Sequence, residues 1–381
     1  MPILPTLLAE LKEEFARSEK SKERGIWFLH TLLAIILPFT SARTSNLLRV
    51  FRVLFGFTEI GKKHYYTFIA SPKIPWDRLW PRLWKMIPQP ATGGRILVAL
   101  DDYLNPKTGK KIFGCAKMFD HAAKQNQSRY PWAQNVVAIG LLKVIKGRWA
   151  CLPLSQRYYF AKDNIKAYKP TFKGKDIVFQ NKHQQAVEML AEVGRAFQQM
   201  CLLVIADSWF GNQGLWKPLK KALGEHAHLL SRLRANNNLF ALPDVCPGKK
   251  RKGRPTKYGK YLGTATSLAK ANNKRAREVE VNLYGRVRTV MACEQIVIQK
   301  TLKCPIRVVW VYRHTQWIAL FTTDLSLTVP EIIEYYGARW KIDISQPYCL
   351  HKFQVITAHR FSSHASYKST LWADPCIQAV A

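Results

Sequence analysis

Three acidic motifs, far apart in the sequence, supply the side chains best suited to chemistry. Asp101 and Asp102 end one apolar run of strand length, and Asp207 ends a second. Asp343 belongs to a third motif, close to the C-terminus. Carboxylates so widely separated meet only if a fold gathers them, and gathered carboxylates bind divalent cations. Cations held in this way can activate a nucleophile and stabilise a leaving oxygen in phosphoryl transfer.

The residue types favour a pair of Mg²⁺ or Mn²⁺ ions. Hard oxygen ligands suit these cations, which lie about 4 Å apart in two-metal phosphoryl transfer. Asp101 and Asp207 are the first expected metal ligands. Asp102 is the alternative to Asp101, because neighbouring residues of a strand point to opposite faces. Taken singly, each motif also has a structural explanation, since Asp207 could cap a following helix and Asp101 and Asp102 could lie in a turn.

The third motif has the spacing of one helix face. Tyr336, Arg339 and Asp343 fall at positions i, i+3 and i+7 of an expected helix that begins at Pro330, a favourable first-turn residue. The tyrosine and the arginine could hold a phosphate while the acid holds a metal ion. An ordinary amphipathic helix with an exposed Arg–Asp pair would show the same spacing.

The charge of the chain favours a polyanionic partner. Its 381 residues include 59 lysines and arginines against 25 acids, a formal net charge of +34. Nucleic acid is the commonest partner of so basic a protein, and a membrane surface is the alternative. The longest mostly apolar stretch, residues 26–39, contains His30 and Pro38 and is shorter than the roughly 20 residues of a membrane span. We therefore expect a nucleic-acid partner and no membrane.

The elements that must position these residues change along the chain. Residues 1–90 have helical periodicity, whereas apolar runs of strand length and helices follow from residue 95, as in a mixed α/β sheet. Open α/β sheets place their sites at the carboxyl ends of strands, where Asp101 and Asp207 lie. The expected division is a helical domain that could bind DNA (1–90), the first part of a catalytic core (91–235), a basic β-rich insertion (236–303), the end of the core (304–343) and an atypical tail (344–381).

Two basic segments are candidate DNA contacts. Residues 41–55 carry arginines between apolar residues, as in a helix-turn-helix module, although plain helical packing produces the same pattern. The loop that contains Lys252, Arg254 and Lys257 is too basic and too rich in turn residues to pack as core. Arg254 lies between a glycine and a proline and could enter a narrow minor groove, and a solvated loop is the alternative.

The order of these motifs resembles that of DDE-type transposases encoded by bacterial insertion sequences. The similarity is to the broad group named after insertion-sequence family four, including its relatives with an Asp-Asp first motif. It covers residues 95–343, about two-thirds of the chain. The matching segments, in order, are Leu100-Asp101-Asp102, Ile205-Ala206-Asp207-Ser208-Trp209-Phe210, Gly253-Arg254-Pro255 and Tyr335-Tyr336-x-x-Arg339-Trp340-Lys341-Ile342-Asp343.

The resemblance implies a fold, a reaction and partners. The implied fold is α/β: an RNase H-like mixed sheet flanked by helices, with an N-terminal helical domain and a β-rich insertion before the third acid. The implied reaction is cutting at transposon ends and joining of the 3′ hydroxyl to target DNA with two Mg²⁺ (or Mn²⁺) ions. Asp101, Asp207 and Asp343 would be the ligands, and Tyr336 and Arg339 would contact transposon-end phosphates. The implied partners are double-stranded DNA and a second copy of the chain on paired ends, in the cytoplasm of a bacterium and associated with its nucleoid.

The chain departs from this group near its C-terminus. The third acid of the group is glutamate, and here Asp343 is one methylene shorter. Pro347 would disrupt the helix that should continue, and the position of an expected lysine is Leu350. Residues 344–381 have no amphipathic period, so we hypothesise that a frameshift or truncation replaced the C-terminal helices of a now degenerate transposase. The alternative function is therefore a catalytically inactive DNA-binding remnant.

Overall fold

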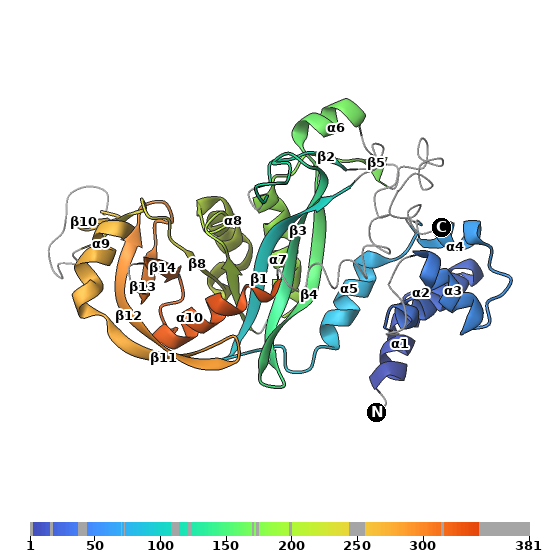
Figure 1. The fold of residues 1–381 in the computed structure, drawn as a ribbon, viewed down its shortest axis with the longest axis horizontal. Helices are drawn as coiled ribbons and strands as arrows, with labels where there is room; N and C mark the ends of the chain where they lie inside the picture. The colour runs from blue at the N-terminus through green and yellow to red at the C-terminus, as the bar shows by residue number, and fades with distance from the viewer. Residues whose placement is uncertain are drawn as a thin grey trace.

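The computed structural model shows a group of N-terminal helices beside one large mixed sheet with helices on both faces (Figure 1). It describes residues 3–15, 18–36, 44–69, 71, 73–107, 114–120, 123–169, 171–172, 175–197, 200–243, 256–313 and 316–342.

The N-terminal helices pack around a core of their own. Amphipathic helices direct their apolar stripes inward, and this core includes Phe15, Phe51 and Tyr65. The last of these helices joins the sheet, because the Trp84 indole Nε1 donates a hydrogen bond of 2.9 Å to the carbonyl oxygen of Leu154. The helices are α1 (Ile3–Glu13), α2 (Glu19–Ile36), α3 (Thr44–Val53), α4 (Lys62–Ile69) and α5 (Trp76–Lys85).

The rest of the described chain is organised by a 12-stranded sheet with the order β10-β9-β12-β13-β14-β8-β7-β1-β3-β2, in which β11 pairs with β12 and β4 with β3. A separate pair, β5 (Thr171–Phe172) and β6 (Lys175–Asp176), lies outside it. The strands of the large sheet are β1 (Arg95–Pro106), β2 (Ala116–Lys117), β3 (Trp132–Ile145), β4 (Arg148–Tyr159), β7 (Cys201–Ala206), β8 (Ala227–Arg232), β9 (Asn238–Phe240), β10 (Tyr261–Thr264), β11 (Arg277–Leu283), β12 (Arg286–Gln299), β13 (Pro305–Arg313) and β14 (Gln316–Thr322).

The centre of this sheet has RNase H-like topology. Strands β4, β3 and β1 are antiparallel neighbours, and β7 and β8 then continue parallel to β1. Helices α7 (Lys182–Ala196), α8 (Gln213–Leu223) and α9 (Ala265–Asn272) contribute to the core on one face. Helix α10 (Val329–Ala338) packs on the other. The predicted α/β class, an RNase H-like mixed sheet flanked by helices, is therefore confirmed.

Strands from the segment expected to form an insertion extend the same sheet. Beyond β8 the order continues through β14, β13 and β12. Strands β11 and β12 form a hairpin that sweeps along α10 (Figure 1). Its loop is Tyr284 and Gly285, with φ values of 57° and 78°. Two successive residues with positive φ make the tight turn whose twist suits a hairpin.

The helix of the third motif is shorter than its sequence predicts. Thr328 caps α10 through the backbone N–H of Glu331, and a proline occupies the first turn, as expected. The helix then ends at Ala338, and a turn follows in which the Ile342 amide donates to the carbonyl oxygen of Arg339. Lys341 and Ile342 are helical again, and Asp343 lies outside the described residues, so the expected helix face can be followed only from Tyr336 to Arg339. Arg339 keeps helical backbone angles and stays on the same side as Tyr336.

Candidate active site

The first two acids lie where the parallel pairing of β1 with β7 ends: Asp207 follows β7, whereas Asp101 lies inside β1, which continues to Pro106. In the parallel pairing of β1 with β7, Leu100 is the partner of Ala206, so Asp101 and Asp207 come next at the same edge. Paired strands are about 4.8 Å apart. Alternation directs both aspartates to the face of α10, because the residues two before each, Ala99 and Ile205, pack in the cluster beneath that helix. The fold therefore brings together two carboxylates that are far apart in sequence.

Asp101 already has a cationic partner from the third motif. Nη1 of Arg339 donates to Oδ2 of Asp101 in a short ion pair. Arg339 is 4% exposed, and its guanidinium lies 4.6 Å from the ring centre of Trp340 and 5.7 Å from that of Tyr336. The rings of Tyr336 and Trp340 and the carboxylate of Asp101 thus hold this buried arginine in place.

Asp207 is held by its own loop. Its Oδ1 accepts backbone hydrogen bonds of 3.0 Å from Trp209 and Phe210, and its carbonyl oxygen accepts one of 2.7 Å from Ser231. The alternative that Asp207 caps the following helix is wrong, because Asn212 caps α8 through the amide of Gly214. The loop therefore fixes one carboxylate oxygen of Asp207, and Oδ2 has no hydrogen bond to a described residue.

Asp102 lies on the opposite face of β1. Its Oδ2 accepts hydrogen bonds of 2.7 Å from Lys182 Nζ and 3.0 Å from Asn135 Nδ2. The Lys182 ammonium also lies 5.4 Å from the ring centres of both Tyr159 and Trp209. Asp101 and Asp102 therefore have separate partners: Arg339, directly after α10, for the first, and Lys182 of α7 and Asn135 of β3 for the second.

Sequence reasoning missed Arg232, the last residue of β8. The pairing of Ile205 with Leu230 places Arg232 level with Asp207 on the α10 face. Burial raises the pKa of Tyr336, and the positive charges of Arg339 and Arg232 partly oppose that shift. The available signal for Arg232 was its place two residues after Leu230 in an apolar run of strand length, but the partner strand was unknown.

The comparison with known families decides the broad class. Residues 10–290 match the model of the DDE superfamily endonucleases, which is more than half of the chain. The chain belongs to the DDE superfamily endonucleases. No curated protein matches the chain. Membership supports a DNA-cleaving enzyme of the nuclease and transposase type, in a family that generally uses divalent metals.

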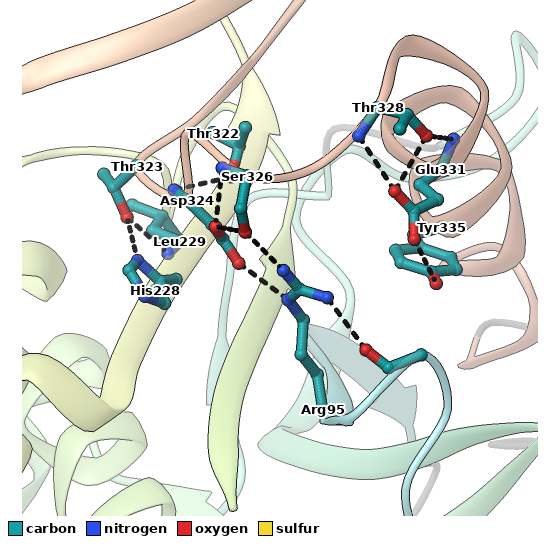
Figure 2. A network of polar contacts seen from close by, with 11 residues as sticks. Arg95, His228, Leu229, Thr322, Thr323, Asp324, Ser326, Thr328, Glu331 and Tyr335 are labelled. Carbon is teal, nitrogen blue, oxygen red and sulfur yellow. Dashed lines mark hydrogen bonds and ion pairs between the residues drawn. The ribbon is translucent and has the colours of Figure 1, made fainter.

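A largely buried ion pair anchors the segment before α10. Nε of Arg95, at the beginning of β1, donates to Oδ2 of Asp324 at 2.6 Å, and Nη2 donates to Oγ of Ser326 at 2.6 Å (Figure 2). Burial alone would raise the pKa of Asp324, but the hydrogen bonds from Arg95 and Ser326 outweigh it and lower the pKa. These contacts tie the segment before α10 to the strand that carries Asp101.

The chemistry of these side chains fits a divalent cation. Asp101 and Asp207 offer hard oxygen ligands at one sheet edge, which suits Mg²⁺ or Mn²⁺. No group of three histidine, cysteine or acidic side chains that could hold a metal occurs within the described ranges. Asp343, the expected third ligand, lies outside the described residues.

Of the five residues predicted to contact DNA, the structure describes three. Lys252 and Arg254 fall outside the described residues, and Lys257 is exposed in the segment before β10. Tyr336 and Arg339 are both buried beside the two acids, at 9% and 4% exposure. Among the described helices, none is long and apolar enough to cross a membrane.

Proposed function

We propose that this protein is a DNA transposase that cuts at the ends of its own element and joins the freed 3′ hydroxyl to target DNA. The observation that carries the proposal is the placement of Asp101 and Asp207 side by side where the pairing of β1 with β7 ends, on the face covered by α10. Arg339, the residue directly after α10, contacts Asp101 there. Two carboxylates beside a buried arginine suit a site that binds metal ions and a phosphate together.

In the proposed site, Asp101 and Asp207 would be ligands of two Mg²⁺ or Mn²⁺ ions, with Asp343 as a third ligand. When bound, such ions activate the attacking hydroxyl and stabilise the leaving oxygen. Asp102 is the weaker candidate, because Lys182 and Asn135 engage its carboxylate on the other face of β1.

The chain's own groups would position the DNA. Arg339 carries a positive charge next to Asp101 and would contact a transposon-end phosphate. The hydroxyl of Tyr336 is protonated at neutral pH, as in any tyrosine, and burial raises its pKa further, so it can donate a hydrogen bond to a phosphate oxygen.

The reaction consists of two balanced displacements. In cutting, the oxygen of water attacks phosphorus and the bond to the 3′ oxygen breaks, which leaves a 3′ hydroxyl and a 5′ phosphate. In joining, that 3′ hydroxyl attacks a target phosphodiester and releases a target 3′ hydroxyl. We further propose that two copies act on paired ends, in the bacterial cytoplasm and in association with the nucleoid. Additional DNA contacts would come from α1–α5, Lys252, Arg254 and Lys257.

The test is cleavage of the DNA that flanks the protein's own gene, with Mg²⁺ or Mn²⁺. We expect nicks at the element ends, and a loss of at least ~100-fold in Asp101→Asn and Asp207→Asn, since each removes metal stabilisation worth several kcal/mol. Asp102→Asn is the matched control, with the same chemical change on the opposite face, and should keep most of the activity. Equal losses in all three variants would contradict the assignment of Asp101 over Asp102.

The runner-up function is an inactive DNA-binding remnant. It is favoured by Asp343, which stands where the resemblance expects glutamate, and by the atypical sequence that follows. Specific binding of element ends without nicking, in the wild type and in Asp343→Glu, would support the remnant. Nicking that appears only in Asp343→Glu would show that the shorter acid had disabled an otherwise intact site.

A further inference from the structure

Four arginines continue the α10 face of the sheet away from the two acids. Each arginine shares its side of the sheet with a residue that packs in the cluster beneath α10. These residues are Leu230 in β8, Val309 in β13 and Val281, which pairs with β12. Strand alternation therefore directs the four side chains to that same face. We call this set the arginine rim; it consists of Arg232 (β8), Arg313 (β13), and Arg288 and Arg286 (β12).

The pairing of the strands links the rim to the active-site edge. Arg232 is level with Asp207 and is the partner of Leu320 in β14. Arg313 ends β13 opposite Gln316, the first residue of β14. The rim therefore begins at β8, crosses β14, which contributes no arginine to it, and continues on β13 and β12, outward from the acids.

All four rim arginines are exposed, and none forms an ion pair with a carboxylate of the described chain. Other arginines are engaged: Arg339 with Asp101, Arg95 with Asp324, and Arg307 with Glu294. Exposed positive charges gathered without counter-charges repel one another, so an anionic partner would stabilise the arrangement.

The hairpin that carries Arg286 and Arg288 is held against α10. The amide of Asn282 donates to Oε1 of Glu334 at 2.6 Å. A Cβ added to Gly337 would come within 2.7 Å of Cδ2 of Leu283, so helix and hairpin are in close contact there. These contacts fix the position of the rim relative to the helix that presents Arg339 to Asp101.

We propose that the arginine rim binds the phosphate backbone of duplex DNA and directs the duplex toward Asp101 and Asp207. Guanidinium groups suit phosphates because their planar N–H groups can donate two parallel hydrogen bonds. The inference rests on the proposed function for the identity of the bound strand, but binding at the rim does not require cleavage.

The experiment measures the affinity of the full-length protein for a short fluorescent DNA duplex over a series of salt concentrations. Each phosphate contact contributes about 0.9 to the slope of log K against log salt. We expect the double variant Arg288→Gln/Arg313→Gln to lower this slope by about 1.8. Arg288→Lys/Arg313→Lys keeps the charges and should retain most of the slope.

The matched control is Arg195→Gln/Lys221→Gln, which removes the same charge from exposed positions on α7 and α8, on the opposite face of the sheet. If the rim variant and this control have the same slope of log K against log salt, the proposal that the rim binds DNA is wrong, even if the wild type cleaves element ends. If only the rim variant loses slope and the wild type does not cleave DNA, the rim binds DNA but the proposed transposase activity is wrong. Thermal unfolding of each variant confirms that the folded state is intact.

Discussion

At the residue scale, the geometry around Asp207 depends on a close approach of two strands. Ser231 of β8 donates to the carbonyl oxygen of Asp207, and the amide of Gly211 donates to the same oxygen at 2.9 Å. A Cβ added to Gly211 would lie 2.6 Å from Cβ of Ser231 and even closer to its Oγ. The loop that holds the second acid therefore has room only for glycine.

We expect Gly211→Ala to displace this loop and to reduce cleavage at least ~10-fold, with a stability cost of about 1–3 kcal/mol for overpacking. Cleavage assays and thermal unfolding measure the two effects. Adding Ser231→Gly should restore much of both losses, because it removes the atoms that clash. Gly61→Ala is the matched control, since only His64 Nδ1, at 3.9 Å, approaches the added carbon. Full activity of Gly211→Ala would contradict this account.

At the element scale, α10 is positioned by contacts at both of its ends. Arg95 and Asp324 tie the preceding segment to the start of β1, and Arg339 reaches Asp101 at the other end. Side-chain exposure is 17% for Arg95 and 7% for Asp324, so removal of either partner leaves a largely buried charge.

We expect Asp324→Asn to lower the free energy of unfolding by about 3 kcal/mol. The pKa of Asp324 is lower in the folded protein than in the unfolded chain, where it is near 3.9. The ion pair therefore contributes to the free energy of unfolding above the unfolded pKa, and this contribution disappears as pH falls through the folded pKa. Urea unfolding of the wild type at pH values from neutral to acid should show this loss, and Asp324→Asn should lack that component. Glu294→Gln breaks the more exposed pair with Arg307 and should cost less than about 1 kcal/mol. Equal costs for the two variants would contradict the anchoring role.

At the scale of the whole molecule, the helical unit α1–α5 and the sheet have separate cores joined through α5. Leu79 of α5 packs in the helical core, whereas Trp84 packs in the sheet core and bonds to Leu154. Trp84 is therefore one buried side chain that couples the two units, beside partly buried contacts of Trp80 and Ile87.

We expect Trp84→Ala to cost about 3–5 kcal/mol and to separate the unfolding of the helices from that of the sheet, so that calorimetry shows two transitions. Trp216→Ala creates a similar cavity within the sheet core, where Trp216 is 6% exposed against 4% for Trp84. It should lower stability without separating the transitions. A single transition in Trp84→Ala would show that other contacts couple the units.

Local patterns were enough to predict the main elements. Continuous apolar runs predict the buried strand segments that precede Asp101 and Asp207, because strands covered on both faces exclude polar residues, although β1 continues beyond Asp101 to Pro106. The motif order identified the family, and α/β periodicity indicated the sheet. The end of α10 at Ala338 was missed, because the spacing of Tyr336, Arg339 and Asp343 is compatible with a longer helix.

The sequence by itself determined which residue types sit at strand ends and the charge available for DNA, since both depend on short-range order and composition. Only the tertiary structure decided between Asp101 and Asp102 as neighbours of Asp207, by placing Arg339 beside one and Lys182 beside the other. It also placed Arg232 level with Asp207. Such contacts join residues that are remote in the chain, and no local periodicity specifies which strands become neighbours or which face a helix covers.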